Sequence, residues 1–360
     1  MKRHLFLLLI LAWVPALAQK KQTGADSLRK RGYSTKIFAV PTLGNSPETG
    51  FYAGAVGLLD FVPRWDSLAR HSNFKAELTY TFNRQFLAQT EHIFTDSAQR
   101  YIILGKNAWL KFPELYWGKK GYQPAFQAWL YDANRIELFN AILFRIRKGM
   151  YLGPVQQFQQ IHIKSTDRRE SEIEAFAELK NNRSSGLGVN ALYDTRTNLL
   201  NPRPGERYFQ IQALTFGSVL GSQTRFQSLD LDFRSYFKWT AKTRIAVQAL
   251  GLFRSEGVPF RLMAMSGGPM MLRGFYFGRT RDQHLVSAQA EIRKQFHKWF
   301  GFTAFVASGI GFGSVTTPLN SVGAGLRIKV DPKENTNMRF DFAWTDRGDF
   351  GFYVAFGEAF

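Results

Sequence analysis

The sequence predicts an all-β protein, a 16-stranded antiparallel transmembrane β-barrel of the outer membrane. Three observations carry this prediction. They are an export signal at the N-terminus, many short segments of alternating apolar and polar residues, and an aromatic content of 15% without a later long apolar run. Alternation with a period of two is the pattern of a strand with one apolar face. Strands cross a bilayer only in a closed barrel, where every backbone polar group is paired.

The N-terminal 34 residues are expected to precede the fold. Residues 1–18 have the features of a secretory signal peptide: a basic start, the short apolar run 5–14 and the small-residue cleavage site Ala16-Leu17-Ala18. Residues 19–34 are polar and basic, which predicts a short periplasmic leader. The chain has no cysteine, so we expect neither disulfides nor a lipoprotein anchor.

The formal net charge is +19, which would also suit a nucleic-acid-binding protein. The basic residues, however, are spread through many strands of an exported chain. We therefore expect no nucleic-acid partner, and assign the charge to a basic lumen or to loops and turns that meet anionic lipid. Outer-membrane lipid is the first expected partner.

Residues 35–360 divide into strand-like segments separated by turn-forming residues, and we expect this whole region to form the barrel. The sixteen expected strands are 36–43, 50–61, 73–82, 85–94, 101–112, 135–146, 150–163, 186–194, 207–216, 226–239, 244–253, 284–296, 300–312, 321–330, 337–345 and 350–360. An even number is typical of bacterial barrels whose two chain ends lie on the periplasmic side.

The alternation is clearest in the last expected strand, where Phe350, Phe352, Val354, Phe356 and Phe360 share one face. Other strands carry charged residues on the opposite face. A soluble β-sandwich would also alternate, but its inner faces would form one apolar core. A charged second face instead favours a wet lumen.

Loop lengths indicate an orientation. The connections 113–134 and 164–185 are long, whereas those at 83–84 and 149 are short. Long outer loops and short periplasmic turns are the expected asymmetry. Residues 167–180 could form a small, mostly charged helix in an outer loop.

The connection between the eleventh and twelfth expected strands contains Leu272-Arg273-Gly274-Phe275, directly after a segment rich in Gly and Pro. By itself this sequence is compatible with an ordinary surface loop. Its place as the sixth outer loop makes it specific. The chain here resembles the outer-membrane protein assembly-factor superfamily, also called the bacterial surface antigen family, whose 16-stranded barrels fold such a tip into the lumen.

Three further motifs carry the resemblance, which covers about residues 35–360. The first is Pro47-Glu48-Thr49-Gly50 between the first two strands. The second lies at the turn after strand 8 and consists of Tyr193, Asp194, Arg196, Asn198, Pro204 and Gly205. The third is Arg339-x-Asp341 together with the terminal Phe360, where such barrels have their assembly signal.

The resemblance implies that Arg273 pairs with inward-facing acidic residues of strands 12 and 13. A buried guanidinium needs such partners. Strand 12 offers Glu291, which we expect to anchor the loop. Strand 13 departs from the pattern, because Ala307 stands where the family often has Asp. We therefore expect one ion pair in place of two.

The larger departure is the short leader, since family members usually carry periplasmic substrate-docking domains. The chain resembles a barrel-only branch without these POTRA domains. The resemblance implies insertion or translocation of protein or lipid through a weakly paired seam between the first and last strands. Pro41 cannot donate a ladder hydrogen bond, and Gly351 and Gly357 soften the last strand. The ordinary alternative is that Pro41 caps an edge and the glycines make room in the lumen.

Unfolded outer-membrane proteins, or a periplasmic protein that supplies docking domains, are the partners that this interpretation implies. A passive pore or a small-molecule or lipid conduit with a basic lumen is the second hypothesis. An enzyme is disfavoured, because no histidine stands in a recognisable nucleophile–base arrangement. No metal-ligand spacing or cofactor motif is present, so we expect neither a metal nor a cofactor.

Overall fold

The computed structural model describes residues 33–46, 50–63, 72–82, 84–96, 98–118, 128–166, 181–313, 315–331 and 336–360. The expected signal peptide, nearly all of the expected leader and the helix expected at 167–180 lie outside these residues. So does the Pro47-Glu48-Thr49 part of the motif between the first two strands. No helix among the described residues is long and apolar enough to cross a membrane.

Sixteen antiparallel strands form one sheet in which each strand pairs with its neighbours in the chain, as the sequence predicts. They are β1 (Tyr33–Ser46), β2 (Gly50–Pro63), β3 (Ser72–Thr81), β4 (Phe86–Thr95), β5 (Tyr101–Tyr116), β6 (Trp129–Arg147), β7 (Met150–Thr166), β8 (Asn182–Asp194), β9 (Arg207–Phe216), β10 (Phe226–Lys238), β11 (Thr243–Arg254), β14 (His284–Gln295), β15 (Phe300–Phe312), β16 (Thr317–Asp331), β17 (Thr336–Thr345) and β18 (Phe350–Phe356).

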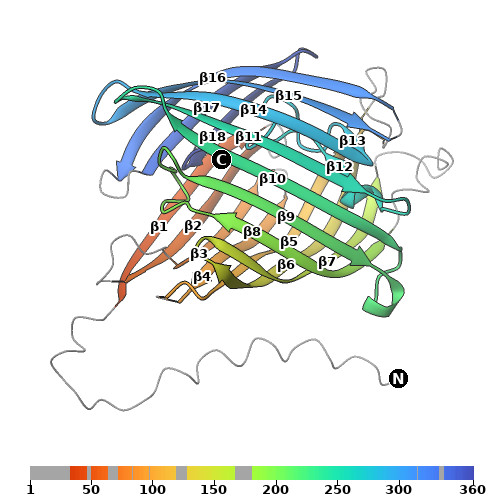
Figure 1. The fold of residues 1–360 in the computed structure, drawn as a ribbon. Coiled ribbons are helices and arrows are strands. Elements are labelled where there is room, and N and C mark those ends of the chain that lie inside the picture. The colour runs from red at the N-terminus through yellow and green to blue at the C-terminus, as the bar shows by residue number, and fades with distance from the viewer. Residues whose placement is uncertain are drawn as a thin grey trace.

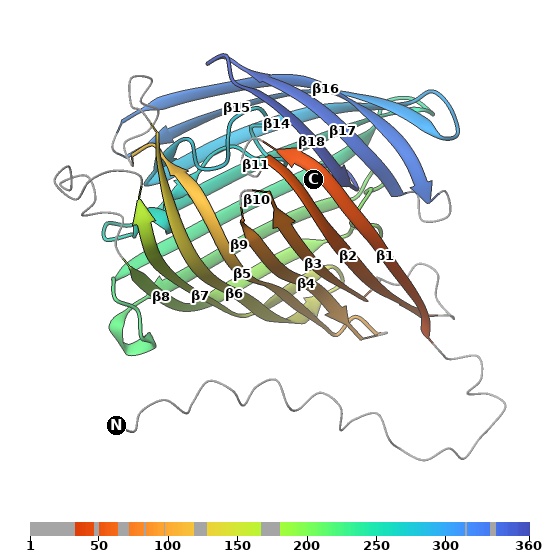
Figure 2. The ribbon, with the colours of Figure 1, turned by 180° about the vertical axis from the view of Figure 1, so that it is seen from behind.

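The sheet curls into a barrel, with β1 coming round beside β18 (Figures 1 and 2). Three short elements lie outside this sheet: the 3-10 helices η5 (Ser218–Leu220) and η6 (Phe260–Leu262), and a hairpin of β12 (Ala264–Met265) with β13 (Arg281–Asp282). The helix η6 and the hairpin belong to the long connection between β11 and β14.

The period-two pattern separates lipid-facing from lumen-facing side chains. On β14, Val286 and Ile292 are each 41% exposed, whereas Ser287 and Glu291 are 2% and 0% exposed. The same alternation of buried and exposed residues runs along β15 and β17. Apolar side chains thus face lipid, and this part of the lumen is filled by other protein groups.

The last strand is shorter than expected, and the prediction for its end was wrong. β18 stops at Phe356, and Gly357 takes a positive φ of 81° that turns the chain inward. Phe360 is therefore buried, at 3% exposure, beside Tyr236 and Ala246. The physical reason is Glu358, which would be an unpaired carboxylate in lipid but meets arginines in the lumen. We call residues 357–360 the C-terminal tail.

Candidate functional site

The candidate site is the inward-folded connection between β11 and β14, residues 255–283, which we call loop 6. Glycines shape its tip: Gly267, Gly268 and Gly274 all have positive φ, the conformation that glycine adopts most readily. The amide of Gly268 donates to the Phe275 carbonyl at 3.1 Å and closes the tip. Leu272 also has a positive φ, of 50°, which is uncommon for a residue with a side chain.

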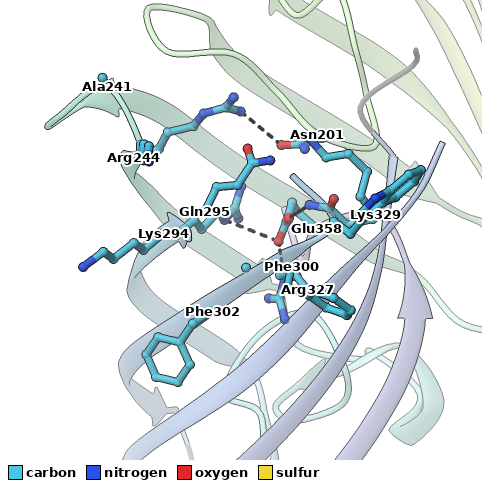
Figure 3. A pocket seen from close by; sticks show the side chains of 15 residues that line it. Asn201, Ala241, Arg244, Lys294, Gln295, Phe300, Phe302, Arg327, Lys329 and Glu358 are labelled. Atoms are coloured by element: carbon cyan, nitrogen blue, oxygen red, sulfur yellow. Dashed lines mark hydrogen bonds and ion pairs between the residues drawn. The ribbon is translucent and has the colours of Figure 1, made fainter. Parts of the chain in front are cut away.

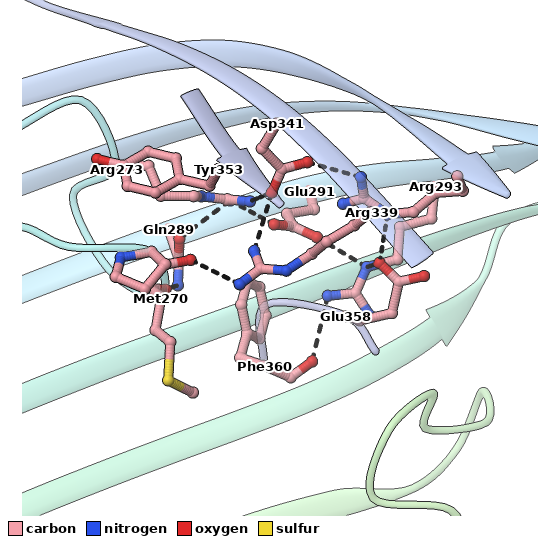
Figure 4. Close-up of polar contacts among 12 residues, drawn as sticks. Met270, Arg273, Gln289, Glu291, Arg293, Arg339, Asp341, Tyr353, Glu358 and Phe360 are labelled. Atoms are coloured by element: carbon pink, nitrogen blue, oxygen red, sulfur yellow. Dashed lines mark hydrogen bonds and ion pairs between the residues drawn. The ribbon is translucent and has the colours of Figure 1, made fainter. Parts of the chain in front are cut away.

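Arg273 stands at the centre of the tip and is fully buried (Figure 4). Its guanidinium donates to Asp341 on β17 at 2.8 Å and to Glu291 on β14. A third donation reaches Gln289 at 3.4 Å, and the Phe305 ring lies 3.5 Å from the guanidinium carbon. Two carboxylates and an aromatic face therefore compensate the buried cation.

The second carboxylate differs from the expectation of a single ion pair. The family pattern places the second acidic residue on strand 13, but Ala307 stands there and belongs to the same apolar cluster as Leu272. Asp341 comes from β17 instead. Asp341 belongs to the Arg339-x-Asp341 motif, which the sequence shows. The sequence does not show that Asp341 pairs with Arg273.

Three more arginines complete the network around these carboxylates, and two of them, Arg293 and Arg339, are labelled in Figure 4. Asp341 also accepts hydrogen bonds from Arg327 at 2.6 Å and Arg339 at 2.9 Å. Glu291 also accepts from Arg293 at 2.8 Å. The network links β14, β16 and β17 through the barrel interior. Loop 6 is held because its Arg273 binds two carboxylates of this network.

Apolar and backbone contacts seat the rest of the tip. Leu272 and Phe275 are fully buried, in a cluster with Leu285 of β14 and Leu319 of β16. The amide of Gly274 donates to the Tyr353 hydroxyl of β18 at 3.0 Å. The tip is thus bound to the wall from β14 to β18.

A second anchor, which the sequence analysis missed, holds the other part of loop 6 to the opposite wall. Arg261 of η6 lies 2.5 Å from Glu114 on β5 and 3.6 Å from Glu137 on β6. Glu114 also accepts a hydrogen bond from Tyr131 at 2.6 Å. The sequence gives no signal for this anchor, because β5 and β6 are longer than the expected strands and Glu114 and Tyr131 fall in the expected loop 113–134.

The motif after β8 forms a compact turn between β8 and β9. Arg196 pairs with Asp194 at 3.0 Å and lies over the Tyr208 ring at 4.1 Å. Burial lowers the pKa of Arg196, but the Asp194 carboxylate outweighs this effect and holds the pKa above its ordinary value. Asn198 accepts the amides of Leu200 and Asn201, each at 2.9 Å.

This turn also contacts β10 and the C-terminal tail. The amide of Gly205, which follows Pro204 and has a φ of 91°, donates to the Tyr236 carbonyl of β10 at 2.7 Å. The Leu200 carbonyl accepts the amide of Glu358 at 2.7 Å. Tyr193, at the start of the motif, lies opposite Met150 in the ladder between β7 and β8.

The tail is fixed inside the lumen by its own charges. Glu358 pairs with Arg327 at 2.7 Å and lies 3.6 Å from Arg293. Arg293 also donates to the Phe360 carbonyl at 3.2 Å and faces its ring. The loop 6 network and the C-terminal tail therefore share two arginines.

Of the expected seam residues, the structure brings Gly351 and Gly357 close to this network. A side chain at Gly351 would collide with the Tyr353 hydroxyl, at 2.5 Å, so Gly351 leaves the space that Tyr353 needs to reach Gly274. Pro41 lies opposite Ala55 in the ladder between β1 and β2.

The fold is that of an outer-membrane β-barrel in which the connection between β11 and β14 folds into the interior. Residues 72–360 match the Omp85 superfamily domain, and the chain therefore belongs to the Omp85 superfamily. The comparison with characterised protein sequences found no match.

Solved structures show the same fold. BamA from Haemophilus ducreyi lacking POTRA domains 1–3 aligns with a TM-score of 0.59 and 12% identity over 91% of this chain and 70% of that chain. CdiB from Acinetobacter baumannii aligns with a TM-score of 0.56 and 12% identity, over 91% of this chain and 66% of its own. CdiB from Escherichia coli aligns with a TM-score of 0.55 and 11% identity, over 89% of this chain and 62% of its own.

Proposed function

We propose that this barrel inserts or translocates protein, or lipid, at the outer membrane through the seam between β1 and β18. One observation carries the proposal. The hydrogen-bonded strand order of the sheet begins at β1 and ends at β18, and no ladder joins these two strands in the described part of the chain. A sheet edge without a ladder presents free backbone groups that can pair with an incoming strand.

The lengths of the two edge strands support this proposal. β1 has 14 residues, whereas β18 has 7 because the chain turns inward at Gly357. Part of the β1 edge thus has no opposite strand to pair with. Pro41 also lacks one backbone donor on β1.

Loop 6 is proposed to gate this seam. Its tip donates a hydrogen bond to Tyr353 on β18, one of the two edge strands. The same tip holds β14 and β17 through Glu291 and Asp341. A loop that fixes β18, one side of the seam, would allow β1 to separate as the mobile edge.

A folding assay in liposomes tests the proposal. The mature protein is reconstituted, an unfolded outer-membrane barrel is added, and its folding is followed by the heat-dependent shift on a gel. We expect faster folding than with empty liposomes, and loss of this acceleration in Arg273→Ala. Arg234→Ala is the control, because Arg234 pairs with Asp232, which reaches loop 6 only indirectly, through Gln248 and Gln289.

The second candidate function is a conduit for small anions. It is favoured by basic side chains at the periplasmic mouth, including Arg244 and Lys329. In this case the wild-type barrel would leak anionic dye without accelerating folding. Neither function requires a nucleophile, metal or cofactor, and we propose no enzymatic activity. A periplasmic protein that supplies docking domains in trans is the partner to seek by crosslinking in cells.

A further inference from the structure

A pocket opens at the periplasmic end of the barrel, between β11, β14, β15, β16 and the C-terminal tail (Figure 3). Its walls are strongly basic. The charged residues that line it are Lys242, Arg244, Arg293, Lys294, Arg327, Lys329 and Glu358. Six cations and one carboxylate therefore line the pocket, whose net charge is strongly positive even for this basic chain.

The single carboxylate is already engaged. Glu358 pairs with Arg327 and lies close to Arg293, and it also accepts a hydrogen bond from Asn337 at 2.7 Å. Arg293 and Arg327 have further carboxylate partners in the loop 6 network. The charges of these two arginines are thus compensated inside the protein.

Arg244 and Lys329 are different. Among the described residues, neither has a carboxylate within ion-pair distance, and the polar contact of Arg244 is with the Asn201 amide oxygen at 3.4 Å. Arg244 lies directly opposite Arg293 in the ladder between β11 and β14. Like charges at directly opposed strand positions destabilise a sheet. Glu358 and Glu206 act on Arg244 from beyond ion-pair distance, while Arg203 adds a further positive charge near it, and Arg244 does the same to Lys329.

The position of the pocket indicates which anion could reach it. It lies at the strand ends on the periplasmic side, where Trp299 and Phe300 line its rim, and both are substantially exposed. Exposed aromatic residues at strand ends are typical of the level of lipid headgroups. The pocket therefore opens where the phosphate groups of the inner leaflet of the outer membrane lie.

We propose that this pocket binds a phosphoryl anion, with Arg244 and Lys329 as its principal ligands and the headgroup of an anionic phospholipid as its source. A phosphoryl group has several acceptor oxygens, and Arg and Lys are both established ligands for it. Binding would bring an anion into direct contact with two cations that have no carboxylate at ion-pair distance among the described residues, and would relieve the repulsion between Arg244 and Arg293.

Isothermal titration calorimetry on the full mature barrel in a zwitterionic detergent tests this site. The probes are dihexanoyl phosphatidylglycerol, dihexanoyl phosphatidylcholine and inorganic phosphate. The test variant is Arg244→Gln/Lys329→Gln. The matched control is Arg147→Gln/Lys148→Gln, which removes one Arg and one Lys that are exposed at the turn between β6 and β7, on the same side of the membrane.

We expect phosphatidylglycerol to bind the wild type and the control alike, with an affinity about tenfold or more lower in the test variant. Binding of phosphatidylglycerol without inorganic phosphate identifies the lipid as the source. Binding of both, each weakened in the test variant, identifies free phosphate as sufficient. Equal binding of phosphatidylglycerol by test and control variants, or equal binding of phosphatidylcholine, overturns the site.

A heat-stability measurement keeps the test independent of folding. Because Arg244 and Lys329 form no ion pair among the described residues and Arg244 is repelled by Arg293, their replacement without ligand should leave the melting temperature unchanged or raise it. Phosphatidylglycerol should raise the melting temperature of the wild type but not that of the test variant. A test variant that melts lower than the control without ligand would show that the two cations already have structural partners, and would contradict the proposal.

Discussion

At the scale of single residues, the burial of Arg273 dominates the energetics of the candidate site. A guanidinium without solvent is tolerated only with carboxylate and hydrogen-bond partners, and here Glu291, Asp341 and Gln289 supply them. Removing one member of a buried ion pair costs about 3–5 kcal/mol, because the remaining charge stays buried. The network of Arg273 should therefore be sensitive to any single deletion.

Arg273→Ala should lower the temperature at which the folded band is lost on a gel, and should expose loop 6 to protease. It leaves Glu291 and Asp341 with less positive charge around them. Arg234→Ala is the control, since its partner Asp232 does not bind Arg273 and is joined to the network only through Gln248 and Gln289. Equal melting temperatures for the two variants would contradict the role of Arg273 as the anchor.

The two carboxylates should not be equivalent. Glu291 serves Arg273 and Arg293. Asp341 serves three arginines, which are Arg273, Arg327 and Arg339. We expect both Glu291→Gln and Asp341→Asn to loosen the loop, with the larger fall in melting temperature for Asp341→Asn. The reverse order, measured by the same gel shift, would mean that the number of paired arginines does not set the energy of the network.

At the scale of elements, loop 6 crosses the lumen and is held at both sides. Its tip binds the wall from β14 to β18 through Arg273 and Tyr353. Its other arm binds β5 and β6 through Arg261. The two anchors are separated along the chain, so each should be removable without the other.

Arg261→Gln should release only the arm. Hydrogen–deuterium exchange should rise in peptides covering residues 255–265 and stay unchanged in those covering 271–275, because the tip keeps its own ion pairs. Arg273→Ala should give the opposite pattern. If both variants raised exchange over the whole of loop 6, the loop would have to be one cooperative unit.

The C-terminal tail is a second element with a defined hinge. Gly357→Ala places a side chain at a φ of 81°, with its Cβ 3.0 Å from the Leu200 carbonyl oxygen. Such strain costs on the order of 1–3 kcal/mol. We expect the tail to detach and become sensitive to carboxypeptidase. Gly221→Ala is a suitable control, because it has a φ of 83° and no neighbour within contact distance of an added Cβ. Equal protease sensitivity of the two would argue against a strained hinge at Gly357.

At the scale of the whole molecule, the sequence predicted all sixteen strands and their order, since strand period and turn residues are local properties. The side-chain partners across the lumen could not be predicted in this way, because they come from distant parts of the chain. The sequence indicated Arg273 and Glu291, but the contributions of Asp341 and Arg261 depend on which strands face each other across the lumen. The inward tail was also missed, because Phe360 fits the apolar face of β18 and only Gly357 and Glu358 break the pattern.

The proposed insertion or translocation requires the seam between β1 and β18 to open. The most direct test is a disulfide bond that holds these two strands together. The chain has no cysteine, so pairs introduced at lipid-facing positions of β1 and β18 can be scanned for oxidative crosslinking without interference. The matched control is Phe342→Cys/Phe352→Cys, whose positions lie directly opposite each other between β17 and β18.

The locked barrels are compared in the liposome folding assay, before and after reduction. We expect the β1–β18 disulfide to abolish the acceleration of folding and reduction to restore it, whereas the β17–β18 disulfide has no effect. A β1–β18 lock that leaves the acceleration intact would contradict insertion through the seam.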